Sequence, residues 1–428
     1  MTIHRIDVAY HENLDQILHG FELHQPSPGT AIDSNSIRLD GWALARRGKV
    51  RRLQLMHGGV PWKSIPVTLH NETAASRHAN VRGTSTCGFR CSFGTLGLPP
   101  QFQIDVFAVL QNGRRVPCAT IRGERDPLRP AYTPKLSPLT ITSLARTGTT
   151  RAMQTLAQHP SIVLDAQYPF EARPAGYWFH MLKILAEPSL GKNTFESDLS
   201  VLPPCPFNSE VISNRPTLGD WFGNAYINRT AAFALENIDE LYGEIAVINN
   251  KSSDVTYFAE KSLPCHLQWI ARELYPNAKE IILIRDFRDM VCSMIAFNHK
   301  RGFATFGREN VESDAEFIRM KRHDVARLLG VAEARKENCL CVRYEDLVLE
   351  PESTLTRIFD YLQISSDAAT VAGVIEAHRS ICQDLDFHRT TADERVSVGR
   401  WKTDLPPKLR ALCNAVFGEL LQEAGYDV

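Results

Sequence analysis

The feature that most constrains the fold is a short apolar strand that runs directly into a glycine-containing turn and then into a helix. The stretch LTITSLARTGTTRAMQTLAQHP begins at Leu139, and its residues 149–157 have the pattern of a helix. The turn between strand and helix reads ARTG. Backbone N–H groups and the helix dipole make such a turn an anion-binding site. An ATP-binding loop would continue from the glycine into Lys-Ser/Thr, but Gly148 is followed by two threonines.

The chain after this point alternates short apolar segments with helical ones. LTITSL, EIILIRD and CLCVRYED are the apolar segments. Strands separated by helices predict an α/β fold, with a mostly parallel sheet and helices on both faces.

The preceding part of the chain has a different pattern, typical of β-structure. Residues from about 30 to 122 contain short alternating segments such as SIRLDGWALA and FQIDVFAVL, and an Asn112-Gly113 turn predicts a hairpin. Because 428 residues exceed one ordinary core, we expect two domains. These are a small all-β, sandwich-like domain over 1–122, with 1–29 as an irregular lead-in, a linker over 123–137, and an α/β domain over 138–428.

Composition excludes several classes of function. The net charge of −1 argues against a nucleic-acid partner, so any anion site is a local cluster. There is no apolar leader and no apolar run long enough to span a bilayer. The ten cysteines are scattered without metal-ligand spacing, which predicts inert thiols, no metal site and a cytoplasmic, reducing location. The sequence leaves the oligomeric state open.

A second cluster follows the strand EIILI. Arg285 stands at the end of that strand, where ligands of open α/β sheets bind. Ser293 follows eight residues later, about two turns into the next helix. We expect Arg285 to bind a ligand, whereas Arg288 and Asp289 are more typical of structural pairing.

Several segments in the same order resemble the sulfotransferases that use 3′-phosphoadenosine 5′-phosphosulfate (PAPS). SLARTGTT resembles their 5′-phosphosulfate loop, and IRDFRDMVCS resembles the segment that binds the 3′-phosphate. YFAEKSLPC, CVRYEDLVLEPE and SVGRWKTDLPP resemble three further segments of that family. Together they cover residues 139 to about 410, and the N-terminal β-region is not part of the resemblance.

The resemblance implies a P-loop-like sulfotransferase fold, PAPS as sulfuryl donor, 3′,5′-ADP as product and no metal. It implies donor-binding roles for Arg146, Thr147, Gly148, Thr149, Thr150, Arg285, Ser293, Arg400 and Lys402. Arg146 stands where many members have lysine, and it should stabilise the leaving phosphate. Arg151 replaces a tryptophan that stacks on adenine in many members, which leaves the adenine contact open.

Glu171 is the candidate base, because a glutamate after the first helix has that role in several branches of the family. The alternative for Glu171 is a helix cap or a salt bridge with Arg173. Lys261 resembles a lysine that faces the acceptor or the transferred sulfate. Its alternative is an exposed ion pair with Glu260.

The resulting hypothesis is a sulfotransferase that moves the sulfuryl group of PAPS to a hydroxyl, less readily an amine, of a glycan or glycoconjugate. Two observations suggest a glycan as acceptor: the attached β-domain and a set of aromatic residues that could stack on sugars. The aromatic residues are Tyr177, Trp178, Trp221, Phe222 and Tyr226, and they are equally typical of a core. The alternatives are a P-loop nucleotide kinase or NTPase, and a degenerate non-catalytic glycan-binding protein.

Overall fold

The structure is a computed structural model, and it describes residues 2–32, 35–167, 169–188, 221–251, 254–302, 308, 311–381, 390–391 and 393–428. Spatial clustering divides the chain into two compact units, each built from separate stretches. Unit 1 comprises Met1–Pro134, Pro174–Ile238 and His266–Pro276. Unit 2 comprises Lys135–Arg173, Asp239–Cys265 and Asn277–Val428. The boundaries at 122 and 138 expected from the sequence stay a prediction.

Unit 1 contains two antiparallel sheets. The first has the order β1-β8-β7-β4-β5 and the second the order β2-β3-β6. Their strands are β1 Ile3–Tyr10, β2 Leu18–Gln25, β3 Ser36–Ala45, β4 Val50–His57, β5 Val60–Pro66, β6 Gly88–Gly94, β7 Gln101–Leu110 and β8 Arg115–Arg125. Side chains of both sheets meet in one core, for example Ile37 and Phe93 with Leu55 and Ile104. This is the expected sandwich, and the expected hairpin joins β7 to β8, with Gly113 at φ 84°.

The expectation that residues 1–29 are irregular was wrong. They contain β1, which pairs with β8, and β2, which pairs with β3. Both strands lie at sheet edges, where one side is exposed, so their apolar residues are sparse and do not alternate cleanly. The expected linker is also shorter at its start, because β8 continues to Arg125.

Helices complete unit 1. α1 spans Glu72–Arg77, α3 Pro174–Ala186 and α8 Leu267–Leu274, and the first part of α7 (Ile227–Ile248) also belongs here. A buried ion pair fixes α8 to the sandwich: Arg125 Nη2 lies 2.6 Å from Glu273 Oε2, and both side chains are almost fully buried.

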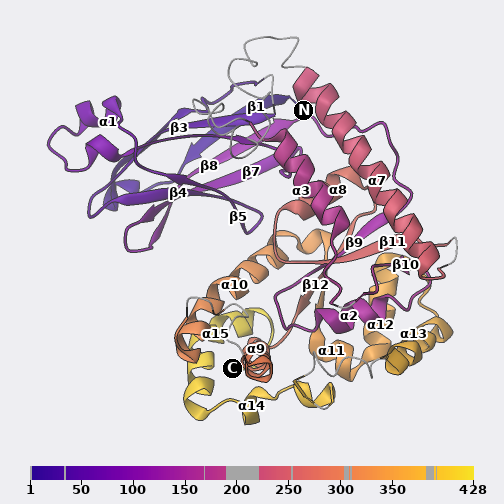
Figure 1. Ribbon diagram of the computed structural model, residues 1–428. Helices are drawn as coiled ribbons and strands as arrows, with labels where there is room; N and C mark the ends of the chain where they lie inside the picture. The colour runs from indigo at the N-terminus through magenta and orange to yellow at the C-terminus, as the bar shows by residue number, and fades with distance from the viewer. Residues whose placement is uncertain are drawn as a thin grey trace. The chain divides into compact units, whose positions relative to one another are not determined.

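Unit 2 is built on a five-stranded sheet of order β10-β11-β9-β12-β13, and every neighbouring pair is parallel. The strands are β9 Ser137–Thr142, β10 Ile162–Val163, β11 Tyr257–Ser262, β12 Lys279–Ile284 and β13 Leu340–Arg343. Figure 1 shows this sheet among the helices of its unit. The expected parallel α/β architecture is therefore confirmed.

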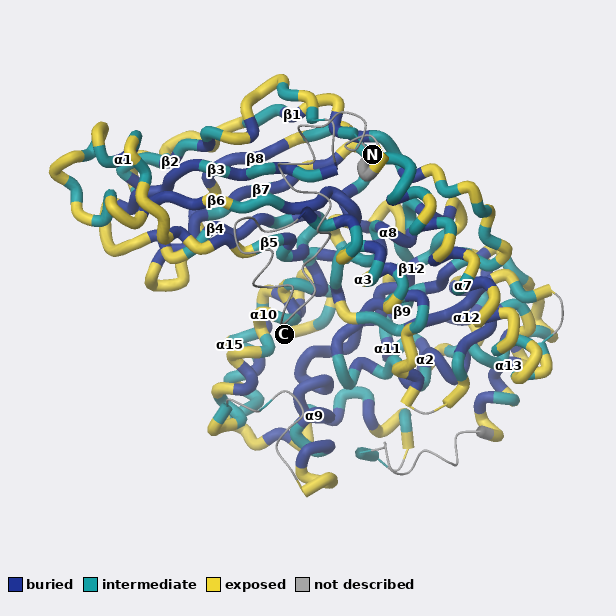
Figure 2. The backbone as a smooth tube through the Cα atoms, turned by 45° about the horizontal axis from the view of Figure 1, so that its top comes forward, coloured by how far each residue is buried: buried dark blue, intermediate teal, exposed yellow. Residues whose placement is uncertain are grey.

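Helices of unit 2 cover both faces of the sheet. They are α2 Thr149–Leu156, α9 Phe287–Arg301, α10 Asp314–Ala334, α11 Tyr344–Leu349, α12 Pro351–Leu362, α13 Ala368–Ile381, α14 Trp401–Asp404 and α15 Pro407–Glu423. One face packs Ile141 and Ile281 against α2, α12 and α13. On the other face, Tyr242 of α7 stacks on Phe258 of β11. Figure 2 shows the strands of the sheet as buried and the outer turns of the helices as exposed.

Among the described residues, we find no helix both long and apolar enough to cross a bilayer. The described residues likewise contain no group of three or more His, Cys, Asp or Glu side chains placed to hold a metal ion.

Candidate active site

The candidate site lies at the carboxyl ends of the central strands of unit 2. The chain begins the sheet at β9, continues to β10 and β11 on one side, and then crosses to β12 and β13 on the other. Strand order reverses at β9, and open α/β sheets bind ligands at such a reversal. The segment after β9 is the ARTG turn that opened the sequence analysis.

This turn ends at the N-terminus of α2 in a conformation suited to an anion. Gly148 is the N-cap with φ 91°, and no side chain caps the helix. The Thr147 hydroxyl donates to the Leu144 carbonyl over 2.7 Å inside the turn, so it stabilises the loop. The structure therefore does not show the alternative of an ordinary threonine-capped helix, and the N-terminus of α2 is a position suited to an anion.

Gly148 is also required by packing. A Cβ atom at this position would lie 2.1 Å from Cδ2 of Tyr344. Tyr344 begins α11 immediately after β13, so the aromatic ring fixes the turn against a neighbouring strand end. Thr149 is half-buried and Thr150 is buried at the start of α2.

Two basic residues from distant segments meet beside the turn. Arg285 donates from Nη1 to the Arg146 carbonyl over 3.2 Å, and Arg146 donates from Nε to the Ser293 hydroxyl over 3.2 Å. The Arg146 guanidinium also lies 4.5 Å from the ring centroid of Phe297. The structure therefore brings together three residues that the sequence had assigned to two phosphate positions.

Arg285 is held at the centre of this cluster. It is only 4% exposed, and its guanidinium lies 4.5 Å from the ring centroid of Tyr344. It donates from Nη2 to the Ser397 carbonyl over 2.6 Å, and Tyr344 and Ser397 join hydroxyl groups over 2.9 Å. The Arg285 Nε is buried and has no hydrogen-bond partner among the described residues. A buried donor in that state is suited to an incoming anion.

Glu171 and Lys261 form a second cluster. Lys261 Nζ lies 3.2 Å from Glu171 Oε1, with the lysine side chain 12% exposed and the glutamate side chain 59% exposed. Lys261 also donates to the Pro169 carbonyl over 2.7 Å. Burial lowers the pKa of Lys261, and the neighbouring Glu171 offsets part of that effect. The two residues predicted separately are thus one ion pair.

Strand geometry argues against the alternative of an ion pair between Lys261 and Glu260. Adjacent residues of a strand point to opposite faces, and Glu260 faces α7, where it accepts from the Tyr242 hydroxyl over 2.6 Å. Lys261 lies beside Ile141 of β9, one residue before the end of β11. The Lys261 ammonium is therefore near the strand that leads into the turn.

The segment Arg395–Lys402 runs alongside α9. Arg400 is buried and pairs within its own loop, with Asp404 over 2.8 Å and Thr390 over 2.7 Å. The backbone N–H groups of Gly399 and Trp401 donate to Asp289 over 2.7 and 2.8 Å. Lys402 is exposed. Asp289 thus has a structural pairing, as expected, and Arg288 has one with Asp286 over 2.8 Å.

Arg151 lies in the wall of a cavity of about 340 Å³. It forms an ion pair with Glu394 and donates to the Leu347 carbonyl over 3.2 Å. Apolar side chains of α12 and α13, among them Leu355 and Ile375, line the same cavity. The residue that replaces the family's tryptophan therefore borders a cavity of mixed polarity, large enough for a planar ring system.

The aromatic residues considered for the acceptor belong to unit 1. Tyr177 is 61% exposed and Trp221 is 42% exposed, while Trp178 and Tyr226 are half-buried. The side chain of Phe222 lies outside the described part of the chain. Tyr177 and Trp221 are therefore not core residues.

Sequence reasoning missed Tyr344, Ser397 as a partner of Arg285, and the ring of Phe297. A usable signal existed for Tyr344, because it follows a strand directly and so stands at the ligand-binding edge of the sheet. Phe297 lies one helical turn beyond Ser293 on α9, and that spacing places both on one face.

The comparison with protein families decides the identity of unit 2. The model of the sulfotransferase family matches residues 138–368, which is more than half of the chain. The chain belongs to the sulfotransferase family.

Similar proteins include two from nematodes. A candidate protein-tyrosine sulfotransferase of Caenorhabditis briggsae is 25% identical over 198 residues, covering 44% of this chain and 62% of that protein. Protein-tyrosine sulfotransferase A of Caenorhabditis elegans is 28% identical over 167 residues, covering 36% of this chain and 41% of that protein. The matches thus span less than two thirds of each relative.

Solved structures give a distant likeness. The sulfotransferase domain from the curacin biosynthetic pathway has 17% identity and a TM-score of 0.40, covering 69% of this chain and all of that domain. Mouse sulfotransferase SULT7A1 complexed with PAP has 14% identity and a TM-score of 0.36, covering 68% of this chain and 86% of that one.

Proposed function

We propose that this sulfotransferase moves the sulfuryl group of PAPS to a hydroxyl group of an acceptor. The observation that carries the proposal is the convergence of Arg146, Arg285 and Ser293 beside the uncapped N-terminus of α2. A helix N-terminus with two arginines beside it is suited to bind an anion. A donor with a 5′-phosphosulfate and a 3′-phosphate offers two such anions.

The residues present fit this donor. The backbone of the turn and Thr149 and Thr150 would hold the 5′-phosphosulfate, and Arg285 and Ser293 would hold the 3′-phosphate. The buried, unpartnered Nε of Arg285 supports that assignment. The cavity beside Arg151 would receive the nucleoside base. Arg400 and Lys402 would add positive charge from the C-terminal segment.

The transfer itself would need little covalent chemistry from the protein. The acceptor oxygen forms a bond to sulfur while the bond from sulfur to the bridging oxygen of the donor breaks, and 3′,5′-ADP leaves with that electron pair. Arg146 would stabilise the charge that develops on the bridging oxygen, which is where fixed donors contribute most. Glu171 would accept the acceptor's proton, and Lys261 would orient Glu171 and the sulfuryl group.

For the acceptor we propose a glycan or glycoconjugate. The support is the β-sandwich of unit 1 and the exposure of Tyr177 and Trp221, since aromatic rings stack on sugar rings. The names of two relatives describe them as protein-tyrosine sulfotransferases. A tyrosine-containing peptide is therefore the acceptor to compare with the glycan.

The deciding experiment is turnover of labelled PAPS by the full chain against glycans, phenols and tyrosine peptides. We expect 3′,5′-ADP to raise the melting temperature, because a ligand that binds only the folded state stabilises it. Absence of a shift at saturating 3′,5′-ADP, together with magnesium-dependent ATP turnover, would replace the proposal with a nucleotide kinase or NTPase.

Variants separate donor binding from chemistry. Arg285→Ala should abolish the shift with 3′,5′-ADP, because a charge-assisted hydrogen bond is worth about 1.5–3 kcal/mol. Glu171→Gln should keep that shift and lower kcat by about 10²–10⁴-fold. An unchanged kcat in Glu171→Gln would show that Glu171 is not the base. If none of the acceptor classes is sulfated, a non-catalytic binding protein would be favoured.

A further inference from the structure

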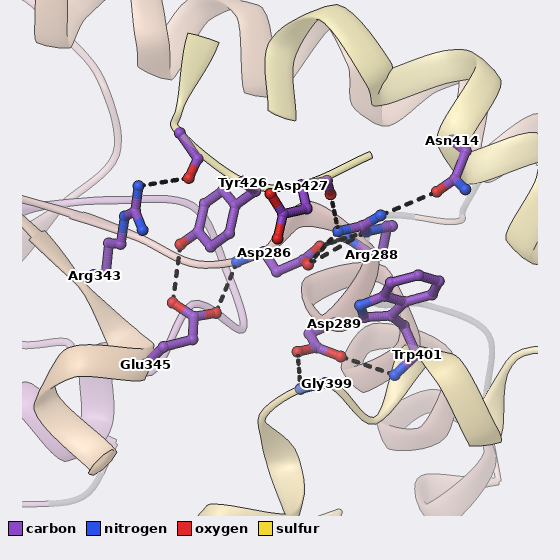
Figure 3. A network of polar contacts seen from close by, with 11 residues as sticks. Asp286, Arg288, Asp289, Arg343, Glu345, Gly399, Trp401, Asn414, Tyr426 and Asp427 are labelled. Atoms are coloured by element: carbon purple, nitrogen blue, oxygen red, sulfur yellow. Dashed lines mark hydrogen bonds and ion pairs between the residues drawn. The ribbon is translucent and has the colours of Figure 1, made fainter. Parts of the chain in front are cut away.

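The segment Arg395–Lys402 is attached to the start of α9 at successive points. The Ser397 carbonyl accepts from Arg285, and the N–H groups of Gly399 and Trp401 donate to the two carboxylate oxygens of Asp289. Figure 3 shows Asp289 between these two backbone groups. The position of this loop is therefore set by residues at and just after the end of β12.

Asp289 is suited to this task by its burial and its charge. Its side chain is fully buried at 0% exposure, and each oxygen accepts one backbone N–H. Hydrogen bonds to a carboxylate are roughly twice as strong as neutral ones. A neutral amide of the same shape has one acceptor oxygen and one NH₂ donor. It could therefore accept from only one of the two backbone N–H groups.

A second anchor holds the same loop from the other side of Trp401. The Arg288 guanidinium lies 3.9 Å from the ring centroid of Trp401. Arg288 is itself fixed by Asp286, by the Asn414 side chain over 3.2 Å and by the Asp427 carbonyl over 2.7 Å. Figure 3 shows Arg288 facing the indole. The tryptophan is thus fixed at its backbone by Asp289 and at its ring by Arg288.

The loop and the candidate 3′-phosphate residues depend on the same helix start. Asp289 and Ser293 lie four residues apart, and therefore on one face of α9. Arg285 contacts the loop at the Ser397 carbonyl, and it contacts the ARTG turn at the Arg146 carbonyl. A shift of the loop would release Arg285 on one side.

We propose that Asp289 is a positioning residue that sets the preference of this enzyme for a 3′-phosphorylated nucleotide. It acts through the loop 397–401 and through Arg285, and it does not contact the donor. This inference rests on the proposed PAPS-dependent activity. It predicts that losing the charge of Asp289 weakens recognition of the 3′-phosphate and leaves recognition of the 5′-phosphate intact.

The test compares 3′,5′-ADP with 5′-AMP on the full chain. The preference is measured as the Kd of 5′-AMP divided by the Kd of 3′,5′-ADP. In Asp289→Asn this ratio should fall about tenfold, because one charge-assisted hydrogen bond is lost. The Kd of 5′-AMP should change by less than about twofold, and in turnover KM for PAPS should rise while kcat at saturating PAPS stays within about threefold. Glu345→Gln is the matched control. Glu345 is a half-buried carboxylate of the same network that accepts from the Asp286 N–H and from the Tyr426 hydroxyl, each over 2.9 Å.

Equal loss of affinity for both nucleotides in Asp289→Asn, or the same change of ratio in Glu345→Gln, would overturn the inference in favour of a general structural role. If Asp289→Asn does not fold, Trp401→Pro takes its place, since it removes one of the two N–H donors to Asp289 at the first residue of α14, where proline is tolerated. A lower ratio in that variant supports the inference, and an unchanged ratio overturns it. Wild-type protein that fails to bind 3′,5′-ADP would instead contradict the proposed function.

Discussion

Gly148 shows how one residue can be required twice in the candidate donor loop. Its φ of 91° lies in the left-handed region, where side chains with a Cβ are strained. Its missing side chain also makes room for Tyr344, whose ring would overlap a Cβ atom at 2.1 Å. The first requirement belongs to the turn itself, but the second depends on a residue almost two hundred positions later.

Gly148→Ala should therefore abolish 3′,5′-ADP binding and lower the melting temperature. The backbone strain alone costs about 1–2 kcal/mol, and the overlap with Tyr344 adds to it. Gly302→Ala is the matched control, because Gly302 has φ 69° and no atom of the described residues lies within 4 Å of its Cβ position. Similar losses of stability in the two variants would mean that the contact with Tyr344 is unimportant.

Asp289 should make donor recognition dependent on pH. Burial raises the pKa of Asp289 to about 6, although Arg285 and the N–H groups of Gly399 and Trp401 act in the opposite direction. The nearby carboxylate of Asp286 also raises the pKa of Asp289. Below pH 6 the carboxyl gains a proton and one oxygen stops accepting, so the preference for 3′,5′-ADP over 5′-AMP should fall.

The same proton affects stability with the opposite sign. Because the folded-state pKa is raised, this group's contribution to stability is fully present below the unfolded pKa, near 4, and is lost as the pH rises through about 6. Between pH 7.5 and 5, wild-type protein should therefore gain free energy of unfolding relative to Asp289→Asn. Chemical denaturation of both proteins across this range measures the difference, and parallel curves would contradict the prediction.

Cys341 differs from the buried cysteines in its exposure and its pKa. It is exposed on β13, and a hydrogen bond from Cys339 lowers its pKa to about 7. Burial instead raises the pKa of Cys118 to about 12 and that of Cys292 to about 11. No sequence pattern predicts this difference, because it depends on how deeply each thiol is buried: Cys118 lies on an interior strand, Cys292 on α9 and Cys341 on an edge strand.

Among the described cysteines, Cys341 should react first with a maleimide at pH 7, since the thiolate is the reactive form. Peptide mapping after brief labelling identifies the site, and Cys341→Ser serves as the control. Faster labelling of Cys118 or Cys292 would mean that the core opens more readily than its burial suggests.

Individual elements of the sheet were predictable where their pattern was strong. β9, β12 and β13 follow the apolar runs that the sequence displays, and α2 begins at Thr149 as expected. β1 and β2 were missed because their apolar residues are sparse and do not alternate cleanly. The ion pair of Lys261 with Glu171 was missed because the segment carrying Glu171 has no periodic pattern that would fix its position.

One face of the parallel sheet holds a buried polar network that no pattern predicts. Glu280 of β12 accepts from the Thr142 hydroxyl over 2.6 Å and from Arg335 over 2.8 Å. Arg335 also donates to the Cys265 carbonyl. The network joins the end of β9, which leads into the ARTG turn, to Cys265 in the segment after β11.

Glu280→Ala should lower the free energy of unfolding by about 3–5 kcal/mol, because it leaves the Arg335 guanidinium buried without its carboxylate. The double variant Glu280→Leu with Arg335→Met should recover most of that loss. Denaturant melts of the three proteins test the prediction. A double variant no more stable than Glu280→Ala would show that packing, and not the unpaired charge, causes the loss.

At the scale of the whole molecule, the composition of unit 1 was not predictable from local patterns. The sequence indicates a β-region that ends near residue 122, but unit 1 also includes Pro174–Ile238 and His266–Pro276. Glu187 accepts from the Gly94 N–H over 2.9 Å, and the Lys183 ammonium lies 3.9 Å from the ring centroid of Trp62. Long-range contacts of this kind leave no periodic trace in the sequence.

A fragment of residues 1–134 should therefore fail to fold as it does in the full chain. It retains Arg125, whose side chain is fully buried, and lacks Glu273. Near-UV circular dichroism and a thermal melt test this, and Arg125→Met in the fragment should restore part of the cooperativity. A fragment that melts cooperatively at the temperature of the full chain would contradict the prediction.

The pairing of Arg125 with Glu273 also limits how this protein could have been assembled or can be re-engineered. A β-module acquired by a single gene fusion would be exchangeable at one splice point, with its stabilising partners on the same side of the joint. Here a swap at residue 137 between two sulfotransferases would transfer the arginine and leave its carboxylate behind. Successful chimaeras should have to exchange α8 together with the sandwich, so these separate stretches of sequence should be inherited as one set.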